Sequence, residues 1–199
     1  MADAKVNIGQ AVSFGWEKTK ANFWLMVGIA LVLMVIGIVP GMIFTKSFVL
    51  GSNLLTWILG SIFGVGLIKI LLKIYDNKPV AIEDFFSLTM NQFLDYLLAS
   101  LMLIVITFVG LILLIIPGII FSLKYQFTLW LILDKNLRPM AALKESNRIT
   151  KGHLWNLFLL WLLSILIIIA GCLVFGVGAL VAVPVVILAQ TYVYKSLVK

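Results

Sequence analysis

The sequence predicts an all-α integral membrane protein with six transmembrane helices, and three observations support this prediction. Hydrophobic residues make up 63% of the chain and the mean hydropathy is +1.17. This is more apolar surface than a soluble protein of 199 residues can bury. Charged residues are only 12% and leave long uncharged runs between them. The basic residues also fall on one side when the runs are counted as six spans. We therefore treat residues 1–199 as a single transmembrane domain.

The length of the uncharged runs gives the expected spans. A helix that crosses about 30 Å of hydrocarbon needs about 20 apolar residues. A Pro-Gly pair at 117–118 and Gly-Val-Gly at 176–178 are expected to divide the two longest runs into hairpins. The second span can extend to about residue 74 if Lys69 and Lys73 reach toward the interface. The expected spans are residues 22–44, 50–74, 96–115, 118–134, 154–175 and 178–195.

The distribution of basic residues predicts the orientation. With the amino terminus in the cytoplasm, thirteen Lys and Arg residues lie on the cytoplasmic side, Lys46 lies outside, and Lys124 falls within span four. Both termini are therefore expected in the cytoplasm, and the first span is expected to remain as a signal anchor. The same basic face is expected to contact anionic lipid headgroups. Because topology accounts for the net charge of +7, we expect no nucleic-acid partner.

An internal repeat suggests how the six spans are organised. Three similar segments, Thr19–Trp24, Thr89–Leu94 and Thr150–Trp155, occur in the same register. They predict three units, residues 6–75, 79–134 and 139–195, each with a short amphipathic interfacial helix followed by a helical hairpin. The alternative is that helices entering a membrane converge on similar residues.

Each amphipathic segment has its own signals. Pro79 and Pro139 suit the first turn of the second and third segments, because the missing N–H is not needed there. We expect these helices to lie in the interface and to anchor the hairpins, although they could also sense or bend the bilayer. In the first segment the positions at helical spacing are Ile8, Ala11, Val12, Gly15 and Thr19.

Several segments resemble a large group of uncharacterised prokaryotic membrane proteins. That group is similar to the membrane domain attached to some bacterial glycerophosphoryl diester phosphodiesterases. The segments that carry the resemblance are Ala11–Lys18, Pro117–Tyr125, Leu131–Asp134, Ala142–Ser146 and Thr150–Trp155. The resemblance implies a six-span fold in a prokaryotic plasma membrane. It implies no phosphodiesterase activity for this chain, because the soluble phosphodiesterase domain is not in the sequence.

The first candidate for a functional site is Lys124. It lies ten residues before Asp134, about 15 Å along a helix, which places it near the middle of the bilayer. A charge at that depth costs roughly 3 kcal/mol, so it usually faces a cavity, a partner or a lipid phosphate. The alternative is a lysine that reaches the interface or caps carbonyls near Pro117. The candidate functional residues are Lys124 with its neighbours Tyr125 and Gln126, and Gln190 and Ser61 as polar companions from other spans.

Small residues four apart predict close helix packing in two spans. Gly60 and Gly64 form one such pair, and Gly37 and Gly41 form the other. Packing within one chain is the expected use, and dimerisation is the alternative.

The sequence offers little for catalysis. It has one histidine, His153, and one cysteine, Cys172, and the only adjacent acidic pair is Glu83-Asp84. We expect no catalytic site, no metal and no cofactor. The leading hypothesis is therefore a non-catalytic plasma-membrane protein that organises lipid or a membrane partner, and the partner could be a second copy of the chain. The alternative is a small transporter or channel with a site near Lys124.

Overall fold

The computed structural model describes residues 7–43, 49–81, 83–86, 89–173 and 178–198. Side-chain surroundings are described within these ranges except at 37–43, 49–55, 85–86 and 113. Helix accounts for 88% and no strand occurs in the described part, which confirms the all-α class. The helices are α1 (Ile8–Ala21), α2 (Phe23–Ile43), α3 (Val49–Tyr75), α4 (Glu83–Phe86), α5 (Met90–Leu113), α6 (Ile115–Tyr125), α7 (Thr128–Lys135), α8 (Pro139–Thr150), α9 (Leu154–Leu173) and α10 (Ala179–Val198).

Several helices are long and apolar enough to cross a membrane, as the sequence predicts. Within the described residues there are five such segments, in α3, α5, α6 with α7, α9 and α10. A sixth arises if α1 and the first part of α2 count as one span, although the chain bends by 100° between them. The chain is therefore a multi-pass membrane protein by helix length and composition, with five or six segments able to span.

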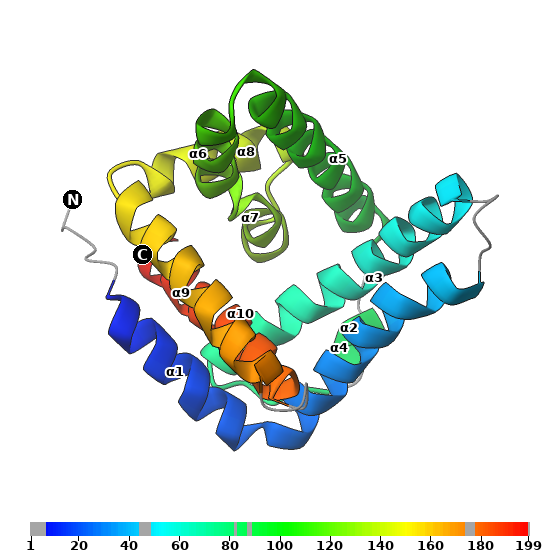
Figure 1. The fold of residues 1–199 in the computed structure, drawn as a ribbon, viewed down its shortest axis with the longest axis vertical. Helices are drawn as coiled ribbons and strands as arrows, with labels where there is room; N and C mark the ends of the chain where they lie inside the picture. Colours follow the sequence, from blue (N-terminus) through cyan, green and yellow to red (C-terminus); the bar gives the residue numbers. More distant parts are fainter. Residues whose placement is uncertain (1–6, 44–48, 82, 87–88, 174–177, 199) are drawn as a thin grey trace.

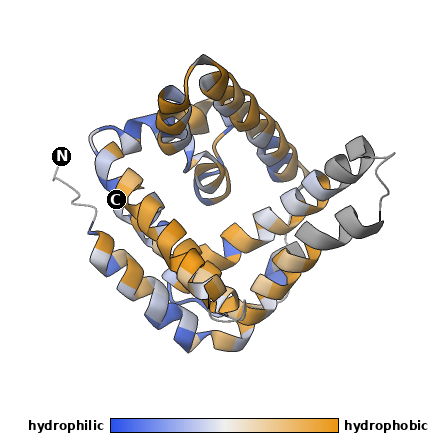
Figure 2. Ribbon diagram, viewed as in Figure 1, coloured by the Kyte–Doolittle hydropathy of each residue, from blue (hydrophilic) through white to orange (hydrophobic). Residues whose placement is uncertain are grey.

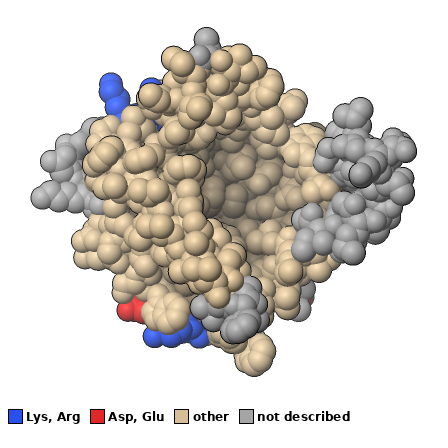
Figure 3. All heavy atoms as spheres, in the orientation of Figure 1, with Lys and Arg blue, Asp and Glu red and all other residues tan. Residues whose placement is uncertain are grey.

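The helices do not form one parallel bundle. Figure 1 shows α1, α9 and α10 running alongside one another, while α2 and α3 cross this group at a steep angle. The α5–α6 pair lies on the opposite side of α9 from α1. Helix α10 contacts α1, α2, α3, α8 and α9. Figure 2 shows hydrophobic positions along nearly all of α5 and α9, and hydrophilic positions on α1, α8 and the turn after α8. Figure 3 shows that this face is hollowed in its centre and that its charged residues lie at the rim.

Helix α1 packs its small-residue face on α10. Ala11, Gly15 and Thr19 are all buried, and they belong to the set that the sequence places at helical spacing. A Cβ added at Gly15 would lie 2.3 Å from the backbone carbonyl oxygen of Val185. The expected face is therefore the packed one, but it contacts a protein helix, because glycine lets two backbones approach closely. The expectation that α1 lies in the lipid interface stays a prediction.

The other two amphipathic segments differ from each other. Pro139 is the first residue of α8, as expected, and α8 buries one face through Ala142, Ser146 and Thr150. Pro79 lies outside any helix, in contrast to the expectation, and α4 begins only at Glu83 and is four residues long. The physical reason is local: Lys78 N–H bonds to the carbonyl of Lys73, which closes α3 and leads the chain into an extended segment.

The break between the third and fourth expected spans lies earlier than the Pro-Gly pair. Helix α5 ends at Leu113, and Leu114 has an extended backbone with φ −172° and ψ 152°. Pro117 falls in the first turn of α6, where its missing N–H needs no partner. The proline is therefore compatible with the helix start, and the chain turns at Leu114, three residues before it.

The two glycine pairs have different surroundings. A Cβ at Gly64 would lie 2.5 Å from the Tyr96 hydroxyl, so the Tyr96 side chain of α5 packs onto α3 at this glycine. A Cβ at Gly60 would meet nothing within 4 Å among the described atoms. Gly37 and Gly41 lie in α2, and the packing expected for them falls outside the described side-chain surroundings.

We expect Gly15→Ala to destabilise the protein by about 1–3 kcal/mol, because the added methyl group meets backbone atoms that cannot move aside. Gly60→Ala is the matched control, and it should cost nothing or stabilise slightly because alanine favours helix. Thermal unfolding of both variants in the same detergent measures the difference. Equal midpoints for the two variants would show that α1 does not pack on α10.

Candidate functional site

A cavity between α5, α6, α9 and α10 brings two of the predicted polar residues together. Its volume is about 440 Å³. Gln126 lies at the end of α6 and Gln190 lies in α10, 64 residues later in the sequence. The remaining lining residues are Leu111 on α5, Gly118, Ile119, Ser122 and Leu123 on α6, and Trp161 on α9. The lining therefore combines two amides and one hydroxyl with an apolar wall.

A close approach of α5 and α6 positions one side of this cavity. A Cβ added at Gly118 would lie 2.7 Å from the Leu111 side chain, and one at Gly110 would lie 2.8 Å from Phe121. Glycines at both positions let the two helices pack tightly after the turn at Leu114. Because α6 is fixed against α5 in this way, its Gly118–Ser122–Gln126 stripe, at four-residue spacing, lines the cavity.

Helix α8 holds the other end of α6. The backbone carbonyl oxygen of Lys124 accepts hydrogen bonds from Ser146 Oγ at 2.9 Å and Thr150 Oγ1 at 3.2 Å. This carbonyl lies where α6 ends and the chain turns through Gln126 and Phe127 into α7. An unpaired carbonyl in apolar surroundings is costly, so the two hydroxyls stabilise the break between α6 and α7.

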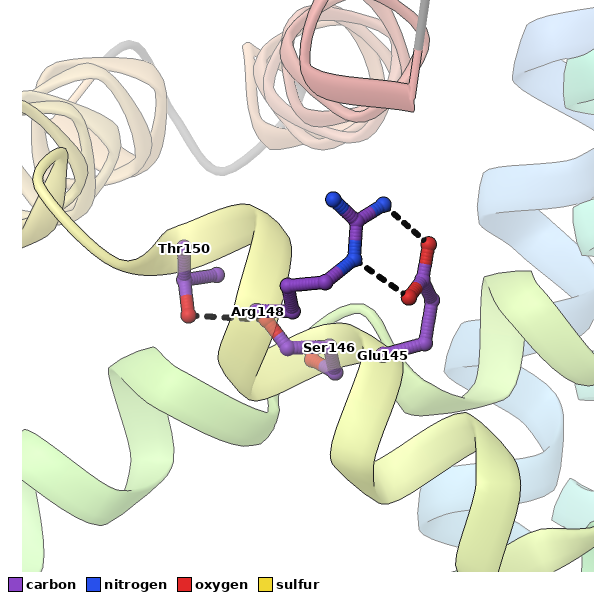
Figure 4. Close-up of polar contacts among 4 residues, drawn as sticks. All are labelled: Glu145, Ser146, Arg148 and Thr150. Carbon is purple, nitrogen blue, oxygen red and sulfur yellow. Dashed lines mark hydrogen bonds and ion pairs between the residues drawn. The ribbon is translucent and has the colours of Figure 1, made fainter.

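Figure 4 shows how α8 divides its polar side chains. Glu145 and Arg148 form a two-point ion pair, with Nε–Oε2 at 2.7 Å and Nη2–Oε1 at 2.6 Å. The Thr150 hydroxyl also bonds to the Ser146 carbonyl oxygen at 2.8 Å. Ser146 and Thr150 are buried, whereas the Arg148 side chain is 59% exposed. The hydroxyls of α8 therefore form hydrogen bonds in the protein interior, and the ion pair of α8 lies toward the surface. The hydrogen bonds from Arg148 hold the pKa of the Glu145 carboxyl below its usual value.

The polar groups of the cavity retain hydrogen-bonding capacity. Ser122 Oγ donates to the Gly118 carbonyl at 3.0 Å, and Gln126 Nε2 donates to the Leu123 carbonyl at 3.1 Å. Each of these bonds uses one hydrogen, so the second N–H and the Oε1 of Gln126 and the lone pairs of Ser122 are available. The Gln190 side chain has no hydrogen-bond partner among the described residues. The cavity therefore offers both donors and acceptors.

The other predicted site residues lie elsewhere. Lys124 and Tyr125 are half-buried and are not among the described lining residues of the cavity. Lys124 contributes its carbonyl to the junction with α8, where Thr150, the last residue of that helix, donates to it. The Tyr125 ring lies tilted against that of Phe121, with ring centroids 6.4 Å apart. Ser61 is buried in α3 and donates to the Trp57 carbonyl at 2.7 Å. The structure thus brings Gln126 and Gln190 together, without Lys124, Tyr125 or Ser61.

A second polar cluster fixes the end of α10. Asp134, at the end of α7, accepts hydrogen bonds from Tyr194 Oη at 2.8 Å and Lys195 Nζ at 2.9 Å. The ion-paired side chains are each less than one-fifth exposed. Lys195 is the only cation for which an ion pair with Asp134 is described. This cluster ties the end of α7 to α10.

Sequence reasoning missed Ser122 and Trp161 as lining residues. Ser122 had a usable signal, since it lies four residues before Gln126 and therefore on the same helix face. Trp161 lies seven residues inside α9, away from the helix ends where tryptophan usually marks the interface. Its position in the middle of a span was the available signal.

Comparison with known proteins identifies relatives but no function. An uncharacterised protein of Mycobacterium tuberculosis and one of Mycobacterium bovis are each 33% identical to this chain over 132 residues, which is 66% of the chain. The match covers 40% of each of those proteins, so the chain spans about two fifths of their length. No family model and no solved structure matches the chain. The chain therefore has homologues in mycobacteria, and the phosphodiesterase-related resemblance stays a prediction.

Replacing both hydroxyls on α8, Ser146→Ala with Thr150→Val, should destabilise the protein by roughly 1–3 kcal/mol, because the Lys124 carbonyl loses both partners. Ser100→Ala is the control, since Ser100 bonds only to Leu97 in its own helix. Unfolding in mixed micelles measures both variants. If the double variant is as stable as the control, the hydroxyls do not stabilise the α6–α7 break.

We also expect a small pH-dependent effect of Glu145→Gln. The pKa of Glu145 is lowered in the folded protein, so its ion pair stabilises the fold above the unfolded value of roughly 4.3 and stops doing so as the pH falls through the lowered value. The variant should be less stable at neutral pH by under about 1 kcal/mol, since the pair is partly exposed. Unfolding curves at neutral and acid pH test this: a stability difference that persists in acid would contradict it.

Proposed function

We propose that this chain is a non-catalytic multi-pass protein of the prokaryotic plasma membrane that organises lipid by holding part of a lipid molecule in the cavity. The observation that carries the proposal is the lining itself: Gln126, Gln190 and Ser122 face one space with Trp161 and aliphatic side chains. A polar group joined to an apolar body matches such a lining, and its volume lies within the range of ligand sites.

The chemistry of the lining favours binding over catalysis. Amide side chains do not act as general acids or bases near neutral pH. A hydroxyl that is hydrogen-bonded within its own helix is not an activated nucleophile. The aliphatic residues and Trp161 supply apolar contact area instead. A lipid held between these helices would also stabilise their arrangement, because a ligand that binds only the folded state shifts the equilibrium toward it.

The orientation and partners belong to the same proposal. The basic residues support cytoplasmic termini and contact with anionic headgroups on the cytoplasmic side. Lys144 in α8 and Lys151, the residue after that helix, are both exposed, which supports such contact. A membrane-protein partner or a second copy of the chain is an additional proposal, and the resemblance to a phosphodiesterase-linked membrane domain agrees with a role beside lipid.

A small transporter is the second candidate function. The observation in its favour is the break between α6 and α7, which lies beside Gln126 in an otherwise apolar segment. Interrupted helices of this kind line substrate sites in many transporters. Substrate flux across the membrane of protein-containing liposomes would be lost in Gln190→Leu if the cavity binds the substrate. It would be lost in Lys124→Ala if Lys124 binds the substrate. Protein that binds lipid but gives no flux would exclude the transporter.

Lipid binding in the cavity is testable by tryptophan quenching. Detergent-solubilised protein is titrated with a mixture of phosphatidylglycerol, phosphatidylethanolamine and diacylglycerol that all carry brominated chains. We expect a saturable quenching component in the native protein that disappears in Trp161→Phe, because Trp161 lines the cavity.

Trp155→Phe is the matched control, since Trp155 lies on the same helix, is 69% exposed and does not line the cavity. Its removal should lower only the gradual, non-saturating quenching by lipid at the protein surface. Saturable quenching that survives Trp161→Phe would show that lipid binds elsewhere.

A further inference from the structure

The cavity carries information about which part of a lipid it holds. We propose that the cavity binds the uncharged glyceride end of a diacylglycerol more tightly than it binds a lipid that would place a phosphate in the same space. This inference rests on the proposed function and names the ligand class of the same cavity. It also assigns Lys124 no part in ligand binding, in contrast to the sequence-based hypothesis of a site near that residue.

The first argument is charge. None of the described lining residues is basic, so no ion pair is available to a phosphate in this space. Moving an unpaired anion out of water into such surroundings is strongly unfavourable. The nearest lysine in sequence, Lys124, lies on the part of α6 that meets α8, where Ser146 and Thr150 bond to its carbonyl. On a helix it is also about 200° from Ser122, which faces the cavity.

The second argument is hydrogen bonding. The available groups are the remaining N–H and the carbonyl of Gln126, the Gln190 amide and the lone pairs of Ser122. Amide N–H groups can donate to the ester carbonyl oxygens of a glyceride. The Ser122 oxygen or an amide carbonyl can accept the single hydroxyl hydrogen of a diacylglycerol. The hydroxyl and the ester carbonyls of the uncharged ligand thus have partners of the right kind, which a buried polar ligand requires.

The third argument is the apolar path away from these groups. Trp161 is 44% exposed, so the cavity wall continues onto the outer surface of α9. Leu162 and Leu166 are exposed on the same helix and continue the apolar surface. Acyl chains can therefore leave the cavity over α9 into the bilayer, while the glycerol end stays between α6 and α10.

The experiment compares three lipids with the same brominated chains, added singly: diacylglycerol, phosphatidate and phosphatidylglycerol. The experiment uses the Trp155→Phe variant, so that Trp161 fluorescence reports lipid in the cavity with less quenching from the protein surface. We expect diacylglycerol to bind at least tenfold more tightly than phosphatidate. Gln126→Leu with Gln190→Leu should weaken diacylglycerol binding about tenfold, equivalent to about 1.4 kcal/mol. Lys124→Ala should leave all three affinities unchanged.

The outcomes separate this inference from the proposed function. Phosphatidate binding that equals or exceeds diacylglycerol binding, or that falls in Lys124→Ala, overturns the inference while lipid binding in the cavity stands. No saturable quenching with any lipid overturns the proposed function itself. If the double leucine variant does not fold, Gln190→Asn provides the test: its shorter amide keeps the polarity but withdraws the group, so diacylglycerol affinity should fall and phosphatidate affinity should not. An unchanged diacylglycerol affinity in Gln190→Asn would count against the inference.

Discussion

The close packing of α1 on α10 is the contact on which the rest of the arrangement depends. At Gly15 the two backbones approach so closely that a methyl group would lie 2.3 Å from the Val185 carbonyl oxygen. Helix α10 also contacts α2, α3, α8 and α9, so its position sets theirs. Its residues Leu188, Val193 and Tyr194 are fully buried, so α10 is surrounded mainly by other helices along this part of its length.

A second constraint explains why polar residues gather between α6 and α10. In apolar surroundings every backbone group needs a partner. The interruption between helices α6 and α7 leaves the Lys124 carbonyl without a partner in its own helix. Ser146 and Thr150 of α8 supply that partner. Because α8 satisfies the backbone, the Gln126 side chain at the same break remains available to the cavity. Lys124 thus has a structural part through its backbone, and the binding role passes to the neighbouring amide.

Much of the fold could be predicted from local sequence. The start of α9 at Leu154 and of α8 at Pro139 agree with the predicted boundaries, because charges and a proline mark them. The length and apolar character of the spans are likewise local properties. The turn at Leu114 could not be predicted, since no glycine or proline marks it and Pro117 suits the helix that follows. The short α4 could not be predicted either, because Pro79 reads as a helix start.

The candidate site was predictable only in part, for a geometric reason. Both Gln126 and Gln190 are polar residues in apolar spans, and the sequence analysis grouped them around Lys124, Gln126 as its neighbour and Gln190 as a companion from another span. Which of two neighbouring residues faces a cavity depends on the rotation of the helix, and tertiary contacts set that rotation. The packing of α6 on α5 at Gly110 and Gly118 and on α8 at Ser146 turns Gln126 inward. The contact with α8 joins residues 22 positions apart, and the approach of α6 to α5 depends on the turn at Leu114, which no glycine or proline marks. No local pattern therefore reveals the rotation of α6.

The most direct test of this account is the reactivity of a cysteine placed at position 190. In a Cys172→Ala background, Gln190→Cys in delipidated micelles should react with a small neutral maleimide, because the position lines the cavity. Added diacylglycerol should protect it. Ser164→Cys, at a buried position in α9 outside the cavity lining, should stay unreactive in both conditions. A Gln190→Cys thiol that never reacts, or that reacts equally with and without lipid, would contradict the claim that α6 and α10 enclose a lipid site.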